Sequence, residues 1–394
     1  MFRLSPFILL CVTGFFAIFS STISKSPVLP LFASHLGADP LGVGMVASVS
    51  AFVGIIASIP AGVLSDRWGR KRMLMVAGVV FSTAPFLYMY VTTIWQLALV
   101  RFYHGLATAI FLPVGMALVS DLFHLERGEK IGWFSTSTLV GRFAAPLAGG
   151  SVIGLLAYNP PASYRAVYLV CGLAGLAALL LIFRIKLPVT ERKTGKEWNE
   201  VWRALRSVLS HRAIILTASV EAAILFSYGT FETFLPLYAI KGGLSAYHVG
   251  IILSSQVITL ALTKPLMGRF SDKHGRRPQI ISGAITGAIC IAAFSLTKSF
   301  SGLLALSILF GFSLAVVTSA TSAFIADLST HESRGSAMGI LGSIMDIGHT
   351  TGPLASGFIA VHLGFAGSFI GASLVALIAA SVFMCGVPGT AQVK

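Results

Sequence analysis

The chain has 394 residues, of which 55% are hydrophobic and only 11% charged, with a mean hydropathy of +0.86. Soluble domains usually carry about 25% charged residues, so this composition excludes an ordinary soluble protein and predicts a membrane protein with many spans. The net charge of +14 does not indicate a nucleic-acid partner, because Lys and Arg gather in alternate loops between the apolar segments. Such loops are typical of the cytoplasmic side of a membrane.

Twelve apolar runs are long enough to cross a bilayer as helices, which need about 20 residues each. Because lipid offers no partners for backbone groups, we predict an all-α membrane protein with twelve transmembrane helices. The even number of spans and the basic loops place both termini in the cytoplasm, with the protein in the inner or plasma membrane. The predicted spans are 6–33, 41–65, 73–93, 95–122, 131–157, 165–187, 212–240, 245–269, 279–297, 300–327, 335–362 and 364–387.

A charged hairpin follows the second predicted span. It reads GVLSDRWGRKR from Gly62 to Arg72, and it returns as GRFSDKHGRRP from Gly268 to Pro278. The two copies align without gaps at an offset of 206 residues, which indicates a duplication with both copies running in the same direction. The matching residues that we single out are Gly62, Asp66, Arg67, Gly69, Arg70, Lys71 and Asp121 in the first half, and Gly268, Asp272, Gly275, Arg276 and Asp327 in the second half.

These hairpins predict a gate. Asp66 lies at the C-terminal end of a span, where the helix dipole disfavours a carboxylate unless cations compensate it. Arg67, Arg70 and Lys71 supply cations, and Asp121 is placed to accept a bond from Arg70. We predict a latch whose ion pairs hold the cytoplasmic side closed and break as two halves of the chain rock. The alternative is ordinary charge that fixes topology.

The longest polar connection divides the chain into two sets of six spans. It runs from Pro188 to Arg212, and its Trp, Leu and Val spacing predicts a short amphipathic helix on the cytoplasmic surface. We therefore expect an N-terminal six-helix bundle over 1–187, a cytoplasmic linker over 188–211 and a C-terminal six-helix bundle over 212–394.

Ionisable residues inside spans are costly in lipid and therefore mark functional sites. A carboxyl group in low dielectric favours its neutral form, so it can carry a proton. We expect Arg101 to face the interior and pair with a carboxylate, and Glu221 and Glu232, close to three turns apart, to share one helix face. Fixed salt bridges are the alternative. The candidates for proton coupling or substrate binding are Lys25, Arg101, Arg142, Glu221, Glu232 and Asp346. His104 and His349 are more typical of hydrogen-bonded packing residues than of a proton relay.

With these motifs the sequence resembles the major facilitator superfamily over nearly its whole length. The hairpin is similar to the family pattern G-x-L-x-D-R-x-G-R-[KR], and RFYHG is similar to R-x-x-x-G at Arg101 and Gly105. GWFSTSTLVGRFAAPLAGG resembles the family's antiporter motif, with Ala145 where that motif has Gly, and a similar stretch near Pro353 leaves general packing open. The matched antiporter-motif residues are Gly132, Gly141, Pro146, Gly149 and Gly150.

The resemblance implies a secondary transporter of the 12-helix drug:proton antiporter type, working by alternating access. We predict proton-coupled efflux of small amphipathic or drug-like compounds. The alternative is proton-coupled uptake or exchange of a small anionic metabolite, suggested by Lys25, Arg101 and Arg142. The expected partners are a small-molecule substrate, protons and the lipid bilayer. We expect the protein to be a monomer.

Motifs for enzymatic chemistry are missing from the sequence. It has no G-x-x-x-x-G-K-[ST] phosphate loop for ATP-driven transport and neither an H-E-x-x-H metal pair nor a G-x-S-x-G nucleophile turn. The four cysteines are far apart in apolar runs without metal-ligand spacing. We therefore predict no enzyme, no cofactor and no metal site.

Overall fold

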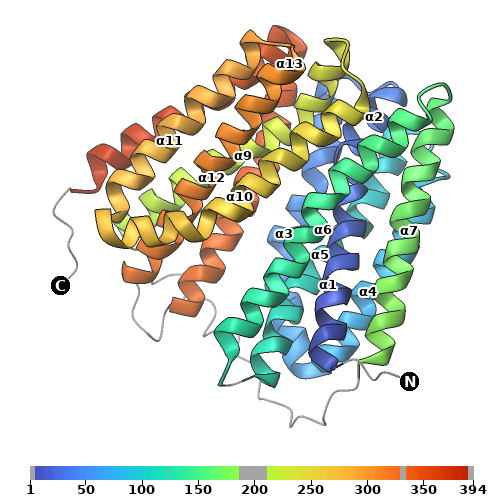
Figure 1. Cartoon of the computed structure of the whole chain (residues 1–394), viewed down its shortest axis with the longest axis horizontal. Coiled ribbons are helices and arrows are strands. Elements are labelled where there is room, and N and C mark those ends of the chain that lie inside the picture. The colour runs from blue at the N-terminus through green and yellow to red at the C-terminus, as the bar shows by residue number, and fades with distance from the viewer. Residues whose placement is uncertain (1–4, 124, 186–210, 329–333, 389–394) are drawn as a thin grey trace. The chain divides into compact units, whose positions relative to one another are not determined.

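The structure, a computed structural model, describes residues 5–123, 125–185, 211–328 and 334–388 (Figure 1). Within these ranges every regular element is a helix, which confirms the predicted all-α fold. The predicted amphipathic helix of the linker lies outside the described residues. The first helices are α1 (Pro6–Ile23), α2 (Val28–His35), α3 (Pro40–Trp68), α4 (Arg70–Tyr88), α5 (Ile94–Leu122), α6 (Arg127–Leu155) and α7 (Pro160–Arg184).

In the second half of the chain, α10 and α12 repeat the bounds of α3 and α5. The helices α3 and α10 each have 29 residues and begin 206 residues apart, and the same holds for α5 and α12. This ungapped match extends the duplication from the hairpins to whole helices. The later helices are α9 (Arg212–Lys241), α10 (Ala246–His274), α11 (Arg276–Ala293), the 3-10 turn η1 (Phe294–Leu296), α12 (Phe300–Leu328) and α13 (Arg334–Gly386).

Ten of the helical segments in the described chain are long and apolar enough to cross a membrane. The long helix α13 is bent at Gly364, whose φ of +69° is not helical, so it contains the last two predicted spans. The first predicted span, 6–33, is in contrast broken into α1 and α2. Pro27 interrupts it because proline has no N–H to continue a helix, and the break leaves Ser24 and Lys25 in a turn.

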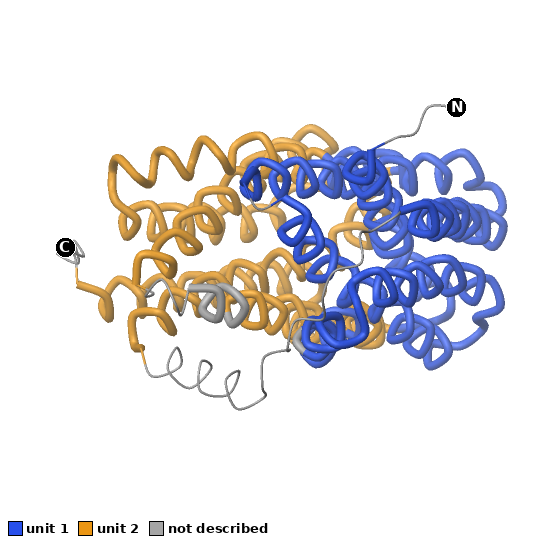
Figure 2. The backbone as a smooth tube through the Cα atoms, turned by 90° about the horizontal axis from the view of Figure 1, so that it is seen from below, with its two compact units in different colours: residues 1–38, 49–195, 245–254 blue, residues 39–48, 196–244, 255–394 orange. Residues whose placement is uncertain are grey.

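The described helices form two compact units (Figure 2). Unit 1 holds residues 1–38, 49–195 and 245–254, and unit 2 holds residues 39–48, 196–244 and 255–394. The helices α3 and α10 therefore each contribute to both units. In unit 1, α1 packs on α6 and α7, and α4 packs on α5 and α7; in unit 2, α9 packs on α13, and α11 packs on α12.

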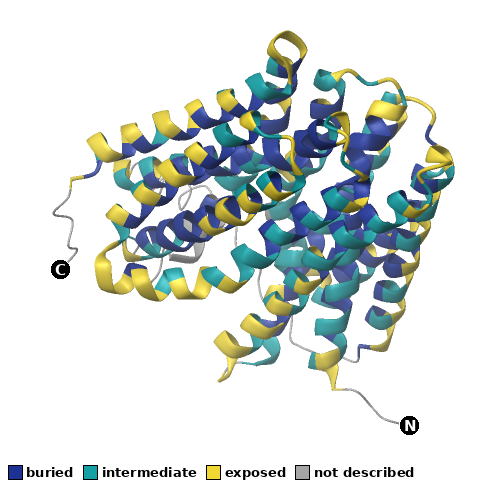
Figure 3. Cartoon of the chain, turned by 45° about the horizontal axis from the view of Figure 1, so that its top comes forward, coloured by how far each residue is buried: buried dark blue, intermediate teal, exposed yellow. Residues whose placement is uncertain are grey.

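Burial follows the helix faces (Figure 3). The core of unit 1 is made of apolar side chains from its packed helices, among them Leu74, Phe81, Phe111 and Ile182. Large apolar side chains such as Leu99 and Leu180 are exposed instead. This arrangement suits a protein whose outer helix faces contact lipid tails rather than water.

Candidate functional site

The first charged hairpin turns between α3 and α4 at Gly69. This glycine has φ of +98°, a conformation that is strained for residues with a side chain. A methyl group at this position would meet nothing within 4 Å, so backbone conformation rather than crowding requires glycine. The turn starts α4 at Arg70, four residues after Asp66.

Arg70 binds three side chains and forms with them the first hairpin cluster, which consists of Ser65, Asp66, Arg70 and Asp121. Its Nη2 lies 2.5 Å from Asp66 Oδ1, and its Nε donates to Asp121 Oδ2 at 3.1 Å. Its Nη1 donates to Ser65 Oγ. The predicted pairing of Arg70 with Asp121 is therefore present, and one guanidinium joins the ends of α3, α4 and α5.

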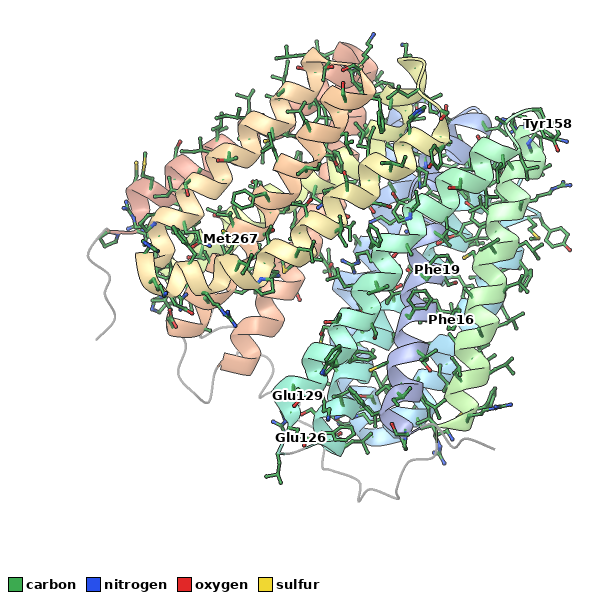
Figure 4. All side chains as sticks on the ribbon, viewed as in Figure 1. Phe16, Phe19, Glu126, Glu129, Tyr158 and Met267 are labelled. Carbon is green, nitrogen blue, oxygen red and sulfur yellow. The ribbon has the colours of Figure 1, made fainter. Side chains whose placement is uncertain are left out.

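The cluster lies at one end of unit 1. Asp66 and Asp121 both stand near helix C-termini, where a carboxylate is disfavoured without a cation, and Arg70 supplies that cation. Figure 4 shows Glu126 and Glu129, which follow α5, at one end of unit 1 and Tyr158 at the other end. The first hairpin cluster is thus at a helix end, as expected for a water boundary.

The second hairpin repeats this arrangement with Ser271, Asp272, Arg276 and Asp327, the second hairpin cluster. Arg276 Nε donates to Asp327 Oδ2 at 3.1 Å, and Nη1 bonds both Asp272 Oδ1 and, at 2.7 Å, Ser271 Oγ. Gly275 has φ of +91°, matching Gly69. Every one of these positions lies 206 residues after its counterpart.

Sequence reasoning missed the serines. Ser65 and Ser271 are both 1% exposed, and each accepts a bond from its arginine. The signal was available, because both hairpins read Ser-Asp-x-x-Gly-Arg at the same offset.

Arg67 and Lys71, the other cations of the first hairpin, do not compensate Asp66 as predicted. Arg67 is exposed and makes no ion pair with the described residues, and Lys71 Nζ donates to the Phe183 carbonyl of α7 at 3.4 Å. The last carbonyls of a helix have no partner within the helix, so Lys71 caps α7 instead of compensating Asp66. Gly62 and Gly268 have nothing within 4 Å of an added methyl group, so close packing among the described residues does not explain these two glycines.

The second hairpin makes a firmer version of the bond by which Lys71 caps α7. Arg277, the counterpart of Lys71, donates from Nε to the Val387 carbonyl and from Nη2 to the Met384 carbonyl, both at 2.7 Å. The two bonds tie the start of α11 to the end of α13.

The antiporter-motif residues of α6, apart from Gly132, serve close helix packing. A methyl group at Gly141 would lie 2.6 Å from the Phe15 carbonyl oxygen of α1, and one at Gly150 would lie 2.5 Å from the Ala246 carbonyl oxygen of α10. Gly149 approaches the start of α2, Ala145 and Pro146 are buried, and Gly132 faces open space. Small residues at such contacts are typical of membrane helices.

A repeated pair of small residues, not recognised from the sequence, packs against these Gly-Pro stretches. Gly250 of α10 lies against the Pro146 carbonyl in unit 1, and Gly44 of α3 lies against the Pro353 carbonyl in unit 2. One turn later, Ser254 Oγ donates to a backbone carbonyl of α6 at 2.8 Å, and Ser48 Oγ donates to one of α13 at 2.6 Å. Both pairs are separated by the same 206 residues, so the two Gly-Pro stretches have equivalent packing roles.

The candidate carboxylates of unit 2 differ in burial. Glu221 of α9 is 0% exposed and accepts a hydrogen bond from Thr321 Oγ1 of α12, while its Oε1 has no hydrogen-bond partner among the described residues. Lys264 of α10 is close enough for its charge to act on Glu221. Glu232 is also buried, and Asp346 of α13 is half-buried.

The candidate cations of unit 1 also differ in burial. Lys25 is half-buried in the turn after α1, Arg142 of α6 is exposed, and Arg101 of α5 is only 2% exposed. The predicted carboxylate partner of Arg101 is wrong within the described residues, where no carboxylate pairs with it. Its Nη1 instead donates to Ser24 Oγ at 3.4 Å.

A duplicated, all-helical chain with charged hairpins at the helix ends is typical of a multi-pass membrane transporter. Residues 10–254 and 243–392 each match the Major Facilitator Superfamily. The chain therefore belongs to the major facilitator superfamily, whose members are secondary transporters and not enzymes, and it is a multi-pass membrane protein.

Relatives agree with this assignment. The chain is 26% identical over 350 residues to an uncharacterised MFS-type transporter of Methanocaldococcus jannaschii, covering 87% of this chain and 88% of the other. It is 27% identical over 356 residues to the multidrug resistance protein MdtG of Salmonella paratyphi C, covering 87% and 86%.

Solved structures match the fold. A bacterial homolog of the human lysosomal transporter Spinster superposes with a TM-score of 0.84 at 15% identity, covering 97% of this chain and 96% of that one. A mutant of the nucleoside transporter NupG gives a TM-score of 0.81 at 14% identity, covering 98% and 100%. These matches confirm the predicted major facilitator fold.

Proposed function

We propose that this transporter exports small amphipathic or drug-like compounds in exchange for protons, by alternating access, from the cytoplasm across the inner or plasma membrane. Two observations support export: the similarity to MdtG, and the antiporter-like stretch of α6 whose glycines pack against α1 and α10. In this proposal both termini and both hairpin clusters lie on the cytoplasmic side.

Glu221 carries the proposed proton coupling. An ionised carboxylate removed from water is strongly disfavoured unless it is fully paired, and Glu221 has one oxygen held by Thr321 and the other without a partner in the described chain. Protonation turns that second oxygen into a neutral group and removes the cost. Glu221 would therefore load a proton where the pathway is open to the outside and release it when water enters from the cytoplasm.

The hairpin clusters would serve as latches. Each cluster holds three helix ends together through a single arginine, at 3.1 Å to Asp121 or to Asp327. All bonds of a cluster join helix ends of the same unit, so each latch would act by fixing or freeing the helix ends of its own unit as the cytoplasmic side closes or opens. Glu232 and Asp346 remain further candidates for the coupling step.

Reconstituted vesicles test the proposal. We expect wild-type protein to accumulate a lipophilic fluorescent cation when a pH gradient is imposed, because each pH unit supplies about 1.4 kcal/mol per proton. Glu221→Gln keeps the shape of the side chain but cannot release a proton. This variant should lose gradient-driven accumulation and still exchange labelled for unlabelled substrate.

The matched control is Glu129→Gln, which removes an exposed carboxylate at the end of unit 1. It should transport like wild type. Gradient-driven accumulation at the wild-type rate by Glu221→Gln would remove Glu221 from the coupling step.

The alternative substrate is a small anionic metabolite, favoured by the buried cation Arg101 and the half-buried Lys25. The same vesicles distinguish the two classes. Uptake of labelled mono- or dicarboxylates that depends on the pH gradient, with no movement of lipophilic cations, would replace export of amphipathic compounds as the function.

A further inference from the structure

The interior of unit 1 contains four buried polar side chains that each keep one polar atom without a hydrogen-bond partner in the described chain. The atoms are Tyr88 Oη, Arg101 Nε, His104 Nε2 and Tyr168 Oη. All four residues are at most 2% exposed. Buried polar atoms are normally satisfied, so four such atoms in one place need an explanation.

These side chains are neighbours, and we call them the buried polar cluster. Arg101 Nη1 and His104 Nδ1 both lie 3.4 Å from Ser24 Oγ. The rings of Tyr88 and Tyr168 stack at 4.4 Å, and the ring of Tyr88 is 5.9 Å from that of His104. The Arg101 guanidinium approaches the Tyr88 hydroxyl closely, but without the geometry of a full hydrogen bond, and its charge also acts on the Tyr168 hydroxyl. Four elements of unit 1, α4, α5, α7 and the turn after α1, thus converge on one guanidinium.

The cluster carries an uncompensated positive charge. No carboxylate pairs with Arg101 in the described ranges, and the other groups around it are hydroxyls, a thiol and an imidazole. A buried ion without a counter-charge is strongly disfavoured. Neutral water would satisfy the hydrogen bonds but would leave that charge in place.

The second repeat shows that the fold does not need this polarity. The residues 206 positions after Tyr88, Arg101 and His104 are Phe294, Ser307 and Phe310, each 0% exposed. In unit 2 the rings of Phe294 and Phe310 lie 6.5 Å apart in an edge contact. The equivalent positions of unit 2 therefore place aromatic rings against each other, and the polar version in unit 1 needs a reason other than packing.

We propose that the buried polar cluster binds a small monovalent anion. The unused N–H of Arg101 and the hydroxyls of Tyr88 and Tyr168 are donors, which is the chemistry that an anion requires. Ser24 donates its own hydrogen to the Ser21 carbonyl at 2.7 Å, so it accepts from Arg101 and from Nδ1–H of His104. That tautomer leaves His104 Nε2 as an acceptor, which favours an anion with a hydroxyl, such as hydrogencarbonate, over a halide.

Thermal unfolding of the purified protein tests the site. Protein is purified in parallel at one pH and ionic strength in sodium hydrogencarbonate, chloride or gluconate, the last being too large for an enclosed site. A ligand that binds the folded state raises the unfolding temperature. We expect a saturable rise of several degrees in hydrogencarbonate, a smaller rise in chloride and none in gluconate.

Variants connect the effect to the cluster. Arg101→Gln should lose the anion dependence, and Arg165→Gln, which removes an exposed cation of α7, should keep it. Tyr168→Phe removes one donor and should raise the half-saturating anion concentration about tenfold. The triple variant Tyr88→Phe, Arg101→Ser, His104→Phe copies the second repeat, so it should fold and respond to no anion.

The possible results of these unfolding experiments have different consequences for the anion site. Equal unfolding temperatures in all three salts, or an anion effect that survives in the triple variant, would overturn the proposal. Stabilisation by chloride but not by hydrogencarbonate would support the anion site and overturn the role given to His104. These measurements need no transport assay, so the anion site stands or falls separately from the proposed export of amphipathic compounds.

Discussion

The two hairpin clusters join equivalent residues in different surroundings. In each, an arginine donates from Nε to an aspartate at 3.1 Å and bonds a second aspartate four residues before it. Asp66 and Asp121 are 26% and 21% exposed, whereas Asp272 and Asp327 are 61% and 46% exposed. The duplication has therefore kept the bonded partners and changed the access of water.

This difference matters because water and salt screen charges. An exposed ion pair usually contributes about 1 kcal/mol or less to the free energy of unfolding. A pair that is shielded from water is more costly to break, because removing one member leaves a charge in a poorly solvated place. The two arginines also share their donors differently. Arg70 uses separate nitrogens for Asp66 and Ser65, whereas Arg276 uses Nη1 for both Asp272 and Ser271.

The largest difference is expected when the arginine is removed. Arg70→Gln leaves Asp66 and Asp121 facing each other with little water and should lower the free energy of unfolding by about 2–3 kcal/mol. Arg276→Gln leaves two exposed carboxylates and should cost about 1 kcal/mol or less. Unfolding of the purified proteins in micelles, measured by heat and by denaturant, compares the two.

Salt sharpens this comparison. Raising ionic strength from about 0.1 M to 1 M shortens the screening length from about 10 Å to 3 Å, which should reduce the cost of Arg276→Gln more than that of Arg70→Gln. Equal costs and equal salt responses would mean that exposure does not distinguish the clusters.

Much of the fold follows from the sequence. The apolar runs and the fixed offset predicted the helices because a bilayer permits few alternatives to a spanning helix. The break between α1 and α2 was missed because the first apolar run continues past Pro27, and the effect of one proline depends on what its neighbours can bond. The bend at Gly364, in contrast, falls where two predicted spans met.

For the candidate sites, the sequence predicted some bonding partners and not others. Arg70 with Asp121 was predictable, since both lie at helix ends of known register. The partner of Arg101 was not, because the sequence gives the cost of a buried charge but not which side chains of other helices meet it. Ser24 and the tyrosines reach Arg101 only through packing of α4, α5 and α7, which no local pattern encodes.

A substitution that acts on the backbone should erase the difference between the hairpins. Gly69 and Gly275 have nearly the same φ, +98° and +91°, so Gly→Ala at either position should cost about 1–2 kcal/mol through strain in the left-handed region. The costs should be equal because exposure of the carboxylates does not enter. Gly62→Ala, where an added methyl group meets nothing within 4 Å in a helix, is the control and should not destabilise. A much larger loss for Gly69→Ala alone would show that crowding, not conformation, selects this glycine.

The smallest expected effect tests how the arginines share their donors. Ser65→Ala removes the sole partner of Arg70 Nη1 in the described chain and should cost about 1 kcal/mol. Ser271→Ala leaves Arg276 Nη1 bonded to Asp272 and should cost about half as much. A double-mutant cycle isolates the bond: in the Arg70→Gln background, Ser65→Ala should add almost nothing. If its cost persists there, the serine stabilises α3 through its other bond, to the Gly62 carbonyl at 2.7 Å, and the arginine is not the reason both hairpins keep a serine.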